Sequence, residues 1–193
     1  MAFSGSVARR SETRGLWLGR GIWALDAYFP KDLDFPDELI PPLATAIGGV
    51  VLSWGMAESG LNATLVMCFS KLGGRHHSDE IPVSLKRKLK FLRLCLRTIA
   101  ALEPYRTDGL ALFAITGQLA KSRNDLIHGF ISDFDPKTGL FTFTNTGSEK
   151  AVALIKGQPK YSISDIRNIG SDCMTHSVAL ANFAQRLVQA FLT

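Results

Sequence analysis

The last long segment of the chain, residues 164–192, reads SDIRNIGSDCMTHSVALANFAQRLVQAFL and decides the class of fold. Its apolar positions recur at alternating steps of three and four, the spacing of a helix face that packs in a bundle. Ser164 is placed to cap this helix, and Asp165 lies in its first turn, where negative charge is favourable. We therefore predict a helix over 164–192 with one buried seam. The seam consists of Ile166, Ile169, Cys173, His176, Leu180, Phe183 and Leu187.

Three further helices are expected upstream of this segment. Proline favours a helix start at Pro42, and glycine marks the end of the same helix at Gly73. The second helix ends before Pro104, and the third is capped within the pair Thr107–Asp108 and ends at Gly129. The predicted ranges are 42–71, 80–102 and 107–128.

A segment of different texture separates the last two helices. Residues 135–139 (DPKTG) are a turn signal, and residues 140–144 (LFTFT) alternate with the period of a strand. Residues 151–155 and 161–163 are candidates for two more short strands. The sequence therefore predicts a mainly α fold: an up-and-down four-helix bundle with a small β-hairpin or meander inserted at 130–163.

Length and composition bound the organisation of the chain. It has 193 residues, a net charge of +5 and 46% hydrophobic residues, which suits one domain with a core of ordinary size. We assign this helical domain to residues 36–193. Residues 1–35 carry four arginines and no apolar signal-peptide core, so we expect a basic, loosely ordered N-terminal arm, with a transit peptide as the alternative.

Two features bear on location in the cell. Residues 39–57 contain no charge, which approaches the length of a membrane span. Prolines and glycines inside this run, and Glu58 directly after it, favour a buried core helix and no membrane. The cysteines are too far apart for a zinc knuckle or a redox pair and are interpreted as buried free thiols, which indicates a cytoplasmic protein. They are Cys68, Cys95 and Cys173.

Positive charge is concentrated in one segment, residues 71–106, which holds 9 basic and 3 acidic side chains. Within the predicted 80–102 helix, an apolar face at steps of three and four is accompanied by a basic row, displaced by one residue and therefore by about 100°. This basic row predicts a track for a phosphate backbone, with a solvated helix face as the alternative. The row consists of Lys86, Lys90, Arg93 and Arg97.

A chemistry-bearing stretch lies at the end of the predicted 107–128 helix. Residues 121–129 read KSRNDLIHG and contain the pattern R-N-x-x-x-H. Asn124 and His128 are four residues apart and share one helix face, and the long side chain of Arg123 can reach the same groove. Lys121 lies one turn earlier. We expect these side chains to form one polar cluster, with an exposed polar helix end as the alternative.

The residue types of this cluster suit cleavage of a phosphodiester without a metal ion. Histidine transfers protons near neutral pH. Arginine binds a phosphate bidentately and stabilises charge that develops in the transition state. Asparagine can orient the imidazole or a ribose hydroxyl. In RNA the neighbouring 2′-hydroxyl supplies the nucleophile, so the protein needs none of its own.

Residues 123–129, RNDLIHG, resemble the signature of HEPN domains, the higher-eukaryote and prokaryote nucleotide-binding superfamily. In that signature four to six residues separate an arginine from a histidine, and a polar residue often follows the arginine. The helix order also agrees with the helical bundle of that family. The resemblance implies a metal-independent endoribonuclease that needs no cofactor and leaves 2′,3′-cyclic phosphate ends, with Arg123 and His128 catalytic and Asn124 assisting.

The resemblance also implies partners. Many HEPN domains form homodimers in which two motif copies share one cleft. Members occur as toxins of toxin–antitoxin pairs, in antiviral defence, and as inactive modules that bind RNA, a nucleotide or a protein. We expect single-stranded RNA to be the substrate, bound along the basic row and Lys121. An inactive binding module is the alternative, and an unrelated helical scaffold is the third.

Two more residues are candidates for support of the site. Glu58 is the only charge in residues 39–70, and a pair with Arg123 would orient that arginine. Exposure of Glu58, or a pair elsewhere, is the alternative. His176 is either a hydrogen-bonded core histidine or a second active-site histidine. The polar stretch 76–80 contains two histidines and two acids, but neighbouring histidines in a loop are usually solvated, so no metal site is predicted.

Overall fold

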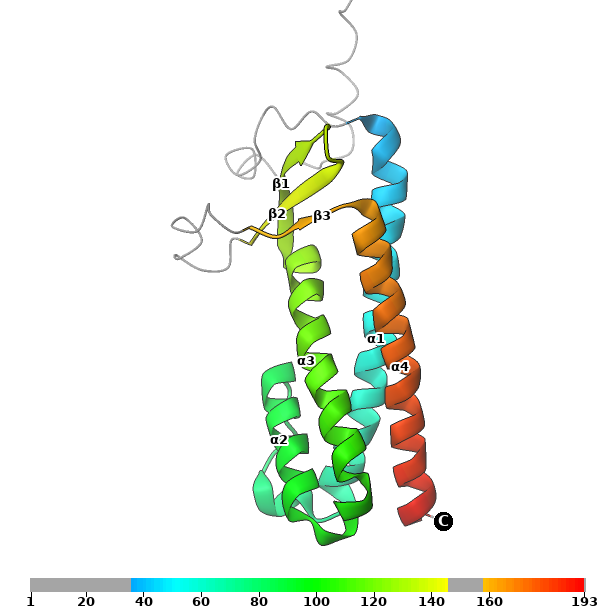
Figure 1. Cartoon of the computed structure of the whole chain (residues 1–193). Coiled ribbons are helices and arrows are strands. Elements are labelled where there is room, and N and C mark those ends of the chain that lie inside the picture. Colours follow the sequence, from blue (N-terminus) through cyan, green and yellow to red (C-terminus); the bar gives the residue numbers. More distant parts are fainter. Residues whose placement is uncertain (1–35, 146–157, 193) are drawn as a thin grey trace, which may run out of the picture. The chain divides into compact units, whose positions relative to one another are not determined.

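Four α-helices and a small sheet form the part of the chain that the computed structural model describes, residues 36–145 and 158–192 (Figure 1). The α-helices are α1 (Ile40–Ser70), α2 (Leu85–Thr98), α3 (Arg106–His128) and α4 (Ile163–Leu192). Short 3-10 helices are η1 (Asp37–Leu39), η2 (Gly74–His77) and η3 (Ala100–Tyr105). The strands are β1 (Gly129–Asp135), β2 (Leu140–Asn145) and β3 (Lys160–Tyr161). The expected arm at 1–35 and the candidate strand at 151–155 lie outside the described residues.

The prediction for the second helix was too long at both ends. Helix α2 begins at Leu85, because the Ser84 hydroxyl caps it by accepting a hydrogen bond from the Arg87 backbone N–H at 3.4 Å. Helical geometry ends at Ile99, whose φ of −85° and ψ of 112° are extended, and the chain continues as η3. The predicted ranges for α1 and α3 agree with the structure to within two residues.

The cap of α4 is Ser162 and not the predicted Ser164. The Ser162 hydroxyl accepts a hydrogen bond from the Asp165 N–H at 3.1 Å, and the Asp165 carboxylate accepts one from the Ser162 N–H at 2.8 Å. This reciprocal arrangement is a capping box, which places the helix start two residues earlier than expected. Hydrogen bonds that the Ser162 hydroxyl, at 2.7 Å, and the Ser162 N–H donate to the carboxylate lower the pKa of Asp165.

The inserted sheet has the strand order β1-β2-β3, with antiparallel pairing throughout. The predicted strand 140–144 and the predicted turn are confirmed: the Asp135 carboxylate accepts hydrogen bonds from the Lys137 N–H and the Thr138 hydroxyl. Phe141 and Phe143 of β2 are buried in one cluster with the first turns of α1 and with Ile166 of α4. The sheet therefore packs against one end of the helical core.

The up-and-down arrangement expected from the sequence is wrong. Figure 1 shows α1 and α4 descending side by side in the same direction. Helix α2 follows α1 in the same sense, because Glu58 contacts Lys88 and, further along both helices, Cys68 contacts Cys95. Only α3 runs against the other α-helices. The reason is the segment 71–84, which leads the chain back along α1 before α2 begins.

Close packing of α1 against α4 is the most extensive helix contact in the described chain. Gly60 permits it, since a Cβ at this position would lie 3.0 Å from the Leu180 Cβ. Helix α1 is nevertheless buried on one side only: it is long and apolar enough to span a membrane, and 28% of its most apolar window is buried. The expectation of a buried core helix is therefore met by one face of α1.

Candidate functional site

The three motif residues meet at the end of α3. The Arg123 Nη1 donates hydrogen bonds to the Asn124 Oδ1 at 3.0 Å and to the His128 Nε2 at 2.8 Å. Asn124 and His128 are exposed, and Arg123 is half-buried. The structure thus brings together the arginine, the amide and the imidazole that the sequence pattern singles out. We call these three residues the motif cluster.

The contact between Arg123 and His128 has a defined direction. A guanidinium has only donors and stays protonated in proteins, so Nε2 accepts this hydrogen bond with its lone pair. The Nε2 atom of His128 is therefore the acceptor in this contact. A neutral imidazole with a lone pair directed at a substrate is the form that acts as a general base.

Trp54 of α1 holds the arginine in place. The Arg123 Cζ lies 5.9 Å from the centroid of the Trp54 ring, within the range of a cation–π contact. Trp54 is itself buried and cannot move far. Within the described chain, the Arg123 Nε is the one buried side-chain nitrogen or oxygen without a hydrogen-bond partner. This orphaned donor is available to an acceptor that enters the site.

Gly129 explains why His128 is exposed at a helix end. The chain leaves α3 at Gly129 and enters β1 directly, and a Cβ at this position would clash with the Asp125 carbonyl oxygen. Next to this corner, the Tyr161 hydroxyl of β3 donates to the Asp125 Oδ2 at 3.2 Å. Burial, with the nearby Asp125 carboxylate, raises the pKa of Tyr161 and keeps the hydroxyl protonated. The sheet thus fixes the last turn of α3, on which the motif cluster stands.

The N-terminus of α2 lies on the same side of the molecule as the motif cluster. Leu85 packs against the cluster of Trp54, Ala120 and Cys173, and Ala120 is one turn before Arg123 on α3. The first turn of α2 contains no acid but carries the exposed Lys86. Positive side chains and the positive end of the helix dipole coincide here, an arrangement that attracts anions.

The four residues of the basic row differ in exposure and in their contacts. Lys86, Lys90 and Arg97 are exposed, whereas the Arg93 Nη2 donates to the Phe113 carbonyl oxygen at 2.7 Å and ties α2 to α3. Lys86 lies at the end of α2 nearest the motif cluster, and Arg97 lies three turns further away. Lys121 is exposed on α3, two residues before Arg123. Lys86 therefore follows Leu85, which packs against the Trp54 and Ala120 cluster, and Lys121 precedes Arg123 on α3.

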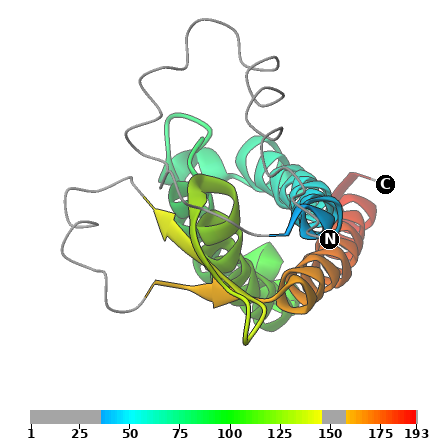
Figure 2. The same cartoon turned by 90° about the horizontal axis from the view of Figure 1, so that it is seen from above.

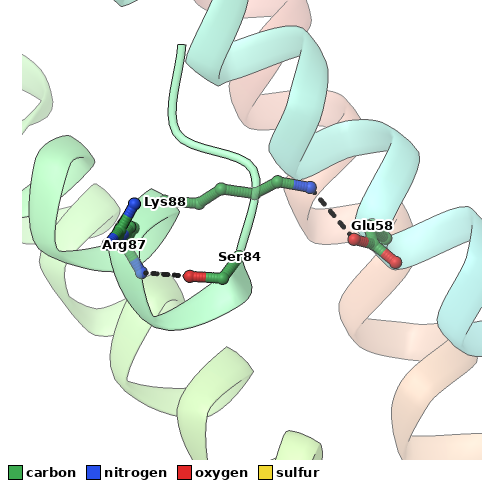
Figure 3. Close-up of polar contacts among 4 residues, drawn as sticks. All are labelled: Glu58, Ser84, Arg87 and Lys88. Carbon is green, nitrogen blue, oxygen red and sulfur yellow. Dashed lines mark hydrogen bonds and ion pairs between the residues drawn. The ribbon is translucent and has the colours of Figure 1, made fainter. Parts of the chain in front are cut away.

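Glu58 pairs with Lys88 and not with Arg123. The Lys88 Nζ lies 3.0 Å from the Glu58 Oε1, and Figure 3 shows the lysine reaching across from α2 to α1 beside the Ser84 cap. Lys88 is buried, which no pattern in the sequence had indicated. The contact expected to orient Arg123 is therefore replaced by an ion pair that joins two helices, and Trp54 takes the orienting position.

His176 is part of the core. It is buried, its Nε2 lies 2.9 Å from the Thr116 Oγ1, and burial lowers its pKa. Thr116 lies seven residues before Arg123, about two turns along α3. The core alternative for His176 is thus the one that the structure supports. His77 hydrogen-bonds Thr98, and the described residues contain no group of three potential metal ligands.

Comparisons of the chain with protein-family models, with curated proteins and with solved structures found no match. The HEPN resemblance therefore depends on residues 123–129 and on the order of helices and strands. What the structure adds is the contact geometry of those residues, which no comparison supplies.

Proposed function

We propose that this protein is a metal-independent endoribonuclease of HEPN type that cleaves single-stranded RNA at the motif cluster. The observation that carries the proposal is the 2.8 Å hydrogen bond from the Arg123 Nη1 to the His128 Nε2. It supports the proposal because it joins arginine, a residue type that binds phosphates, to histidine, a residue type that serves as a general base, at an exposed helix end. Asn124 accepts a second hydrogen bond from the same nitrogen.

The chemistry follows from these positions. His128 Nε2 removes the proton from a ribose 2′-hydroxyl, whose oxygen attacks the adjacent phosphorus while the 5′-oxygen of the next nucleotide leaves. The proton held by His128 is returned to that leaving oxygen. Arg123 stabilises the charge on the non-bridging oxygens of the transition state. The products are a 2′,3′-cyclic phosphate and a free 5′-hydroxyl.

RNA binding must first exchange one contact for another. In the structure Arg123 occupies the lone pair of His128, so a phosphate has to draw the guanidinium away before the imidazole can act as a base. The orphaned Nε of Arg123 favours this exchange, because an incoming phosphate oxygen satisfies it. Lys86, Lys121 and the N-terminus of α2 supply the positive surface that guides the backbone to the site, with Lys90 and Arg97 extending it.

The proposal is tested with purified full-length chain and single-stranded RNA in the presence of a chelator. Cleavage with cyclic phosphate ends is expected for the wild type and is abolished in Arg123→Ala and His128→Ala. Lys137→Ala, on the exposed turn of the sheet, is the matched control. Cleavage that persists in both motif variants would exclude the site. Mass spectrometry of the purified sample establishes that no protein inhibitor has copurified.

An inactive binding module is the second candidate. The same hydrogen bond favours it, since a histidine and an arginine that satisfy each other can also serve as a rigid polar surface. RNA binding without cleavage would select it. We propose that the protein acts in the cytoplasm as a homodimer, whether it cleaves RNA or only binds it. For the nuclease we propose the biological role of a toxin or of a defence component. As a toxin it would have a protein antitoxin as its partner.

A further inference from the structure

One side of the α1–α4 pair is apolar and exposed. Helix α1 presents a row at steps of three and four in which Leu52 is 66% exposed, and α4 presents a parallel row in which Val178 is 53% exposed. We call the two rows together the α1–α4 face. The α1 row consists of Gly48, Leu52, Met56, Ser59, Ala63 and Val66. The α4 row consists of Ser171, Met174, Val178, Ala181, Gln185 and Val188.

The spacing of these rows is that of helices that pack against other helices. On α4 the steps are three, four, three, four and three, which keeps the row straight along the helix. Two shallow depressions of about 280 and 520 Å³ lie along the boundary of the two helices. Small residues such as Gly49 and Ala63 line them, while Met56, Met174 and Val188 form their sides. The face thus has holes and knobs of the kind that interdigitate.

The distribution of charged residues favours a second copy of this chain as the partner of the α1–α4 face. Neither row contains an acidic or basic residue, and Arg167, one turn before Ser171 on α4, is the basic residue that lines the smaller depression at the edge of the face. The chain carries +5 overall, and the exposed Lys86, Lys90 and Arg97 lie on α2. Two copies of a basic protein repel each other overall, and contact through uncharged rows adds no close like-charge pairs to that repulsion. A two-fold axis across the α1–α4 face brings the same uncharged rows together, which is the self-complementary contact of a symmetric dimer.

The dimensions of the face are sufficient for such a contact. Each row covers about 18 residues, or about 27 Å at 1.5 Å per residue, and two adjacent helices are about 20 Å wide. The projected area is therefore on the order of 500 Å² per copy, and two copies reach the total of about 1,000 Å² expected of a specific interface. No described element covers this side of the pair, as Figures 1 and 2 show.

The face lies on the far side of α1 from the motif cluster. Trp54, on which Arg123 stacks, is two residues from both Leu52 and Met56, about 160° around the helix. We propose that the α1–α4 face joins two copies of this chain, and that the two motif clusters of the dimer remain separate and act alone. The inference does not depend on the nuclease activity, and it differs from the shared cleft that the HEPN resemblance implies.

The mass of the full chain in solution tests the interface. Light scattering should give twice the chain mass of 21.1 kDa for the wild type and 21.1 kDa for the double variant Leu52→Glu/Val178→Glu. Ile115→Glu is the matched control, because Ile115 is 43% exposed on α3, outside the face. Circular dichroism and thermal unfolding establish that each variant is folded. A wild type of 21.1 kDa, or a double variant that remains a dimer, overturns the proposal.

Cross-linking gives an independent readout of the position of the interface. The three natural cysteines are buried, so a cysteine introduced by Ser59→Cys is the accessible thiol. A bismaleimide should link Ser59→Cys chains into dimers and should not link Ile115→Cys chains. Two results would overturn the dimer. A monomeric protein whose cysteine at position 59 is protected from maleimide would assign the face to the N-terminal segment. A monomeric wild type that floats with vesicles of phosphatidylcholine and phosphatidylglycerol would assign the face to a membrane.

The separation of the two sites has its own test. If the wild type cleaves RNA, monomeric Leu52→Glu/Val178→Glu should keep the cleavage rate per chain. Loss of cleavage together with loss of the dimer, in a folded variant, would show that the sites cooperate and would overturn this part. Absence of cleavage in the wild type rejects the nuclease and leaves the mass measurement to decide the interface.

Discussion

Arg123 and His128 restrain each other: the guanidinium Nη1 donates to the imidazole Nε2 over 2.8 Å, while the same guanidinium stacks on Trp54. The histidine is thereby engaged through its Nε2 atom, and the arginine is kept at the C-terminal end of α3. Each group positions the other, and in the proposed nuclease this hydrogen bond must break before either group reaches an RNA phosphate.

Replacement of the arginine by lysine is expected to abolish most of the cleavage. Lysine keeps the charge but lacks the planar fork that binds a phosphate bidentately and stacks on Trp54. We expect Arg123→Lys to lower the cleavage rate about 10²- to 10³-fold, close to the decrease for Arg123→Ala, since the missing donors act on the transition state. Single-turnover cleavage of labelled RNA measures it. A lysine variant with nearly wild-type rate would mean that charge alone suffices.

The salt dependence of RNA binding reports on the basic row. Lys86→Gln/Lys90→Gln should lower the slope of log K against log salt by about 0.7 for each phosphate of a single strand that the protein no longer neutralises. Arg93 is left unchanged, because its hydrogen bond to the Phe113 carbonyl is structural. Lys137→Gln/Lys160→Gln, at two exposed positions of the sheet, removes the same number of charges and is the control. Equal slopes for the row variant and the control would make the row an ordinary solvated face.

Much of the fold was accessible from the sequence because its signals are local. Helix periodicity, proline and glycine at the ends, and the DPKTG turn predicted α1, α3, α4 and β2 closely. Helix direction was not accessible, since it depends on how the segment 71–84 returns along α1. Strand β1 lacks strict alternation and contains an irregularity between Ile131 and Asp133, so its pattern was weak.

In the candidate site, too, contacts between residues close in sequence were predictable and contacts between distant residues were not. Arg123, Asn124 and His128 lie within six residues: helix geometry places Asn124 and His128 on one face, and the long side chain of Arg123 can reach them. Trp54 and Lys88 act on partners far away in the sequence, at Arg123 and Glu58, and these contacts depend on how α1 meets α2 and α3. No spacing in a single sequence encodes a contact of that kind.

The ion pair between Glu58 and Lys88 should behave as a structural contact. Glu58→Gln leaves the buried Lys88 ammonium without its counter-charge, and we expect a decrease of about 1–3 kcal/mol in the free energy of unfolding. Adding Lys88→Met should restore most of this stability, since an apolar side chain of similar length replaces the buried charge. Urea unfolding measures both variants. A double variant no more stable than Glu58→Gln would contradict this account of the pair.

The last prediction concerns pH and the core histidine. Burial lowers the pKa of His176 from its ordinary value of 6.5, so the unfolded chain binds a proton at a pH where the folded chain does not. The unfolding free energy should therefore be constant for this group above pH 6.5 and should fall below it, by at most about 1.4 kcal/mol per pH unit, until the folded-state pKa is reached. His176→Asn retains a polar partner for Thr116 but does not titrate. Its stability should change less than that of the wild type between pH 7.5 and 5.5. All other residues are the same in the two proteins, so equal pH slopes would show that His176 is not held neutral by the core.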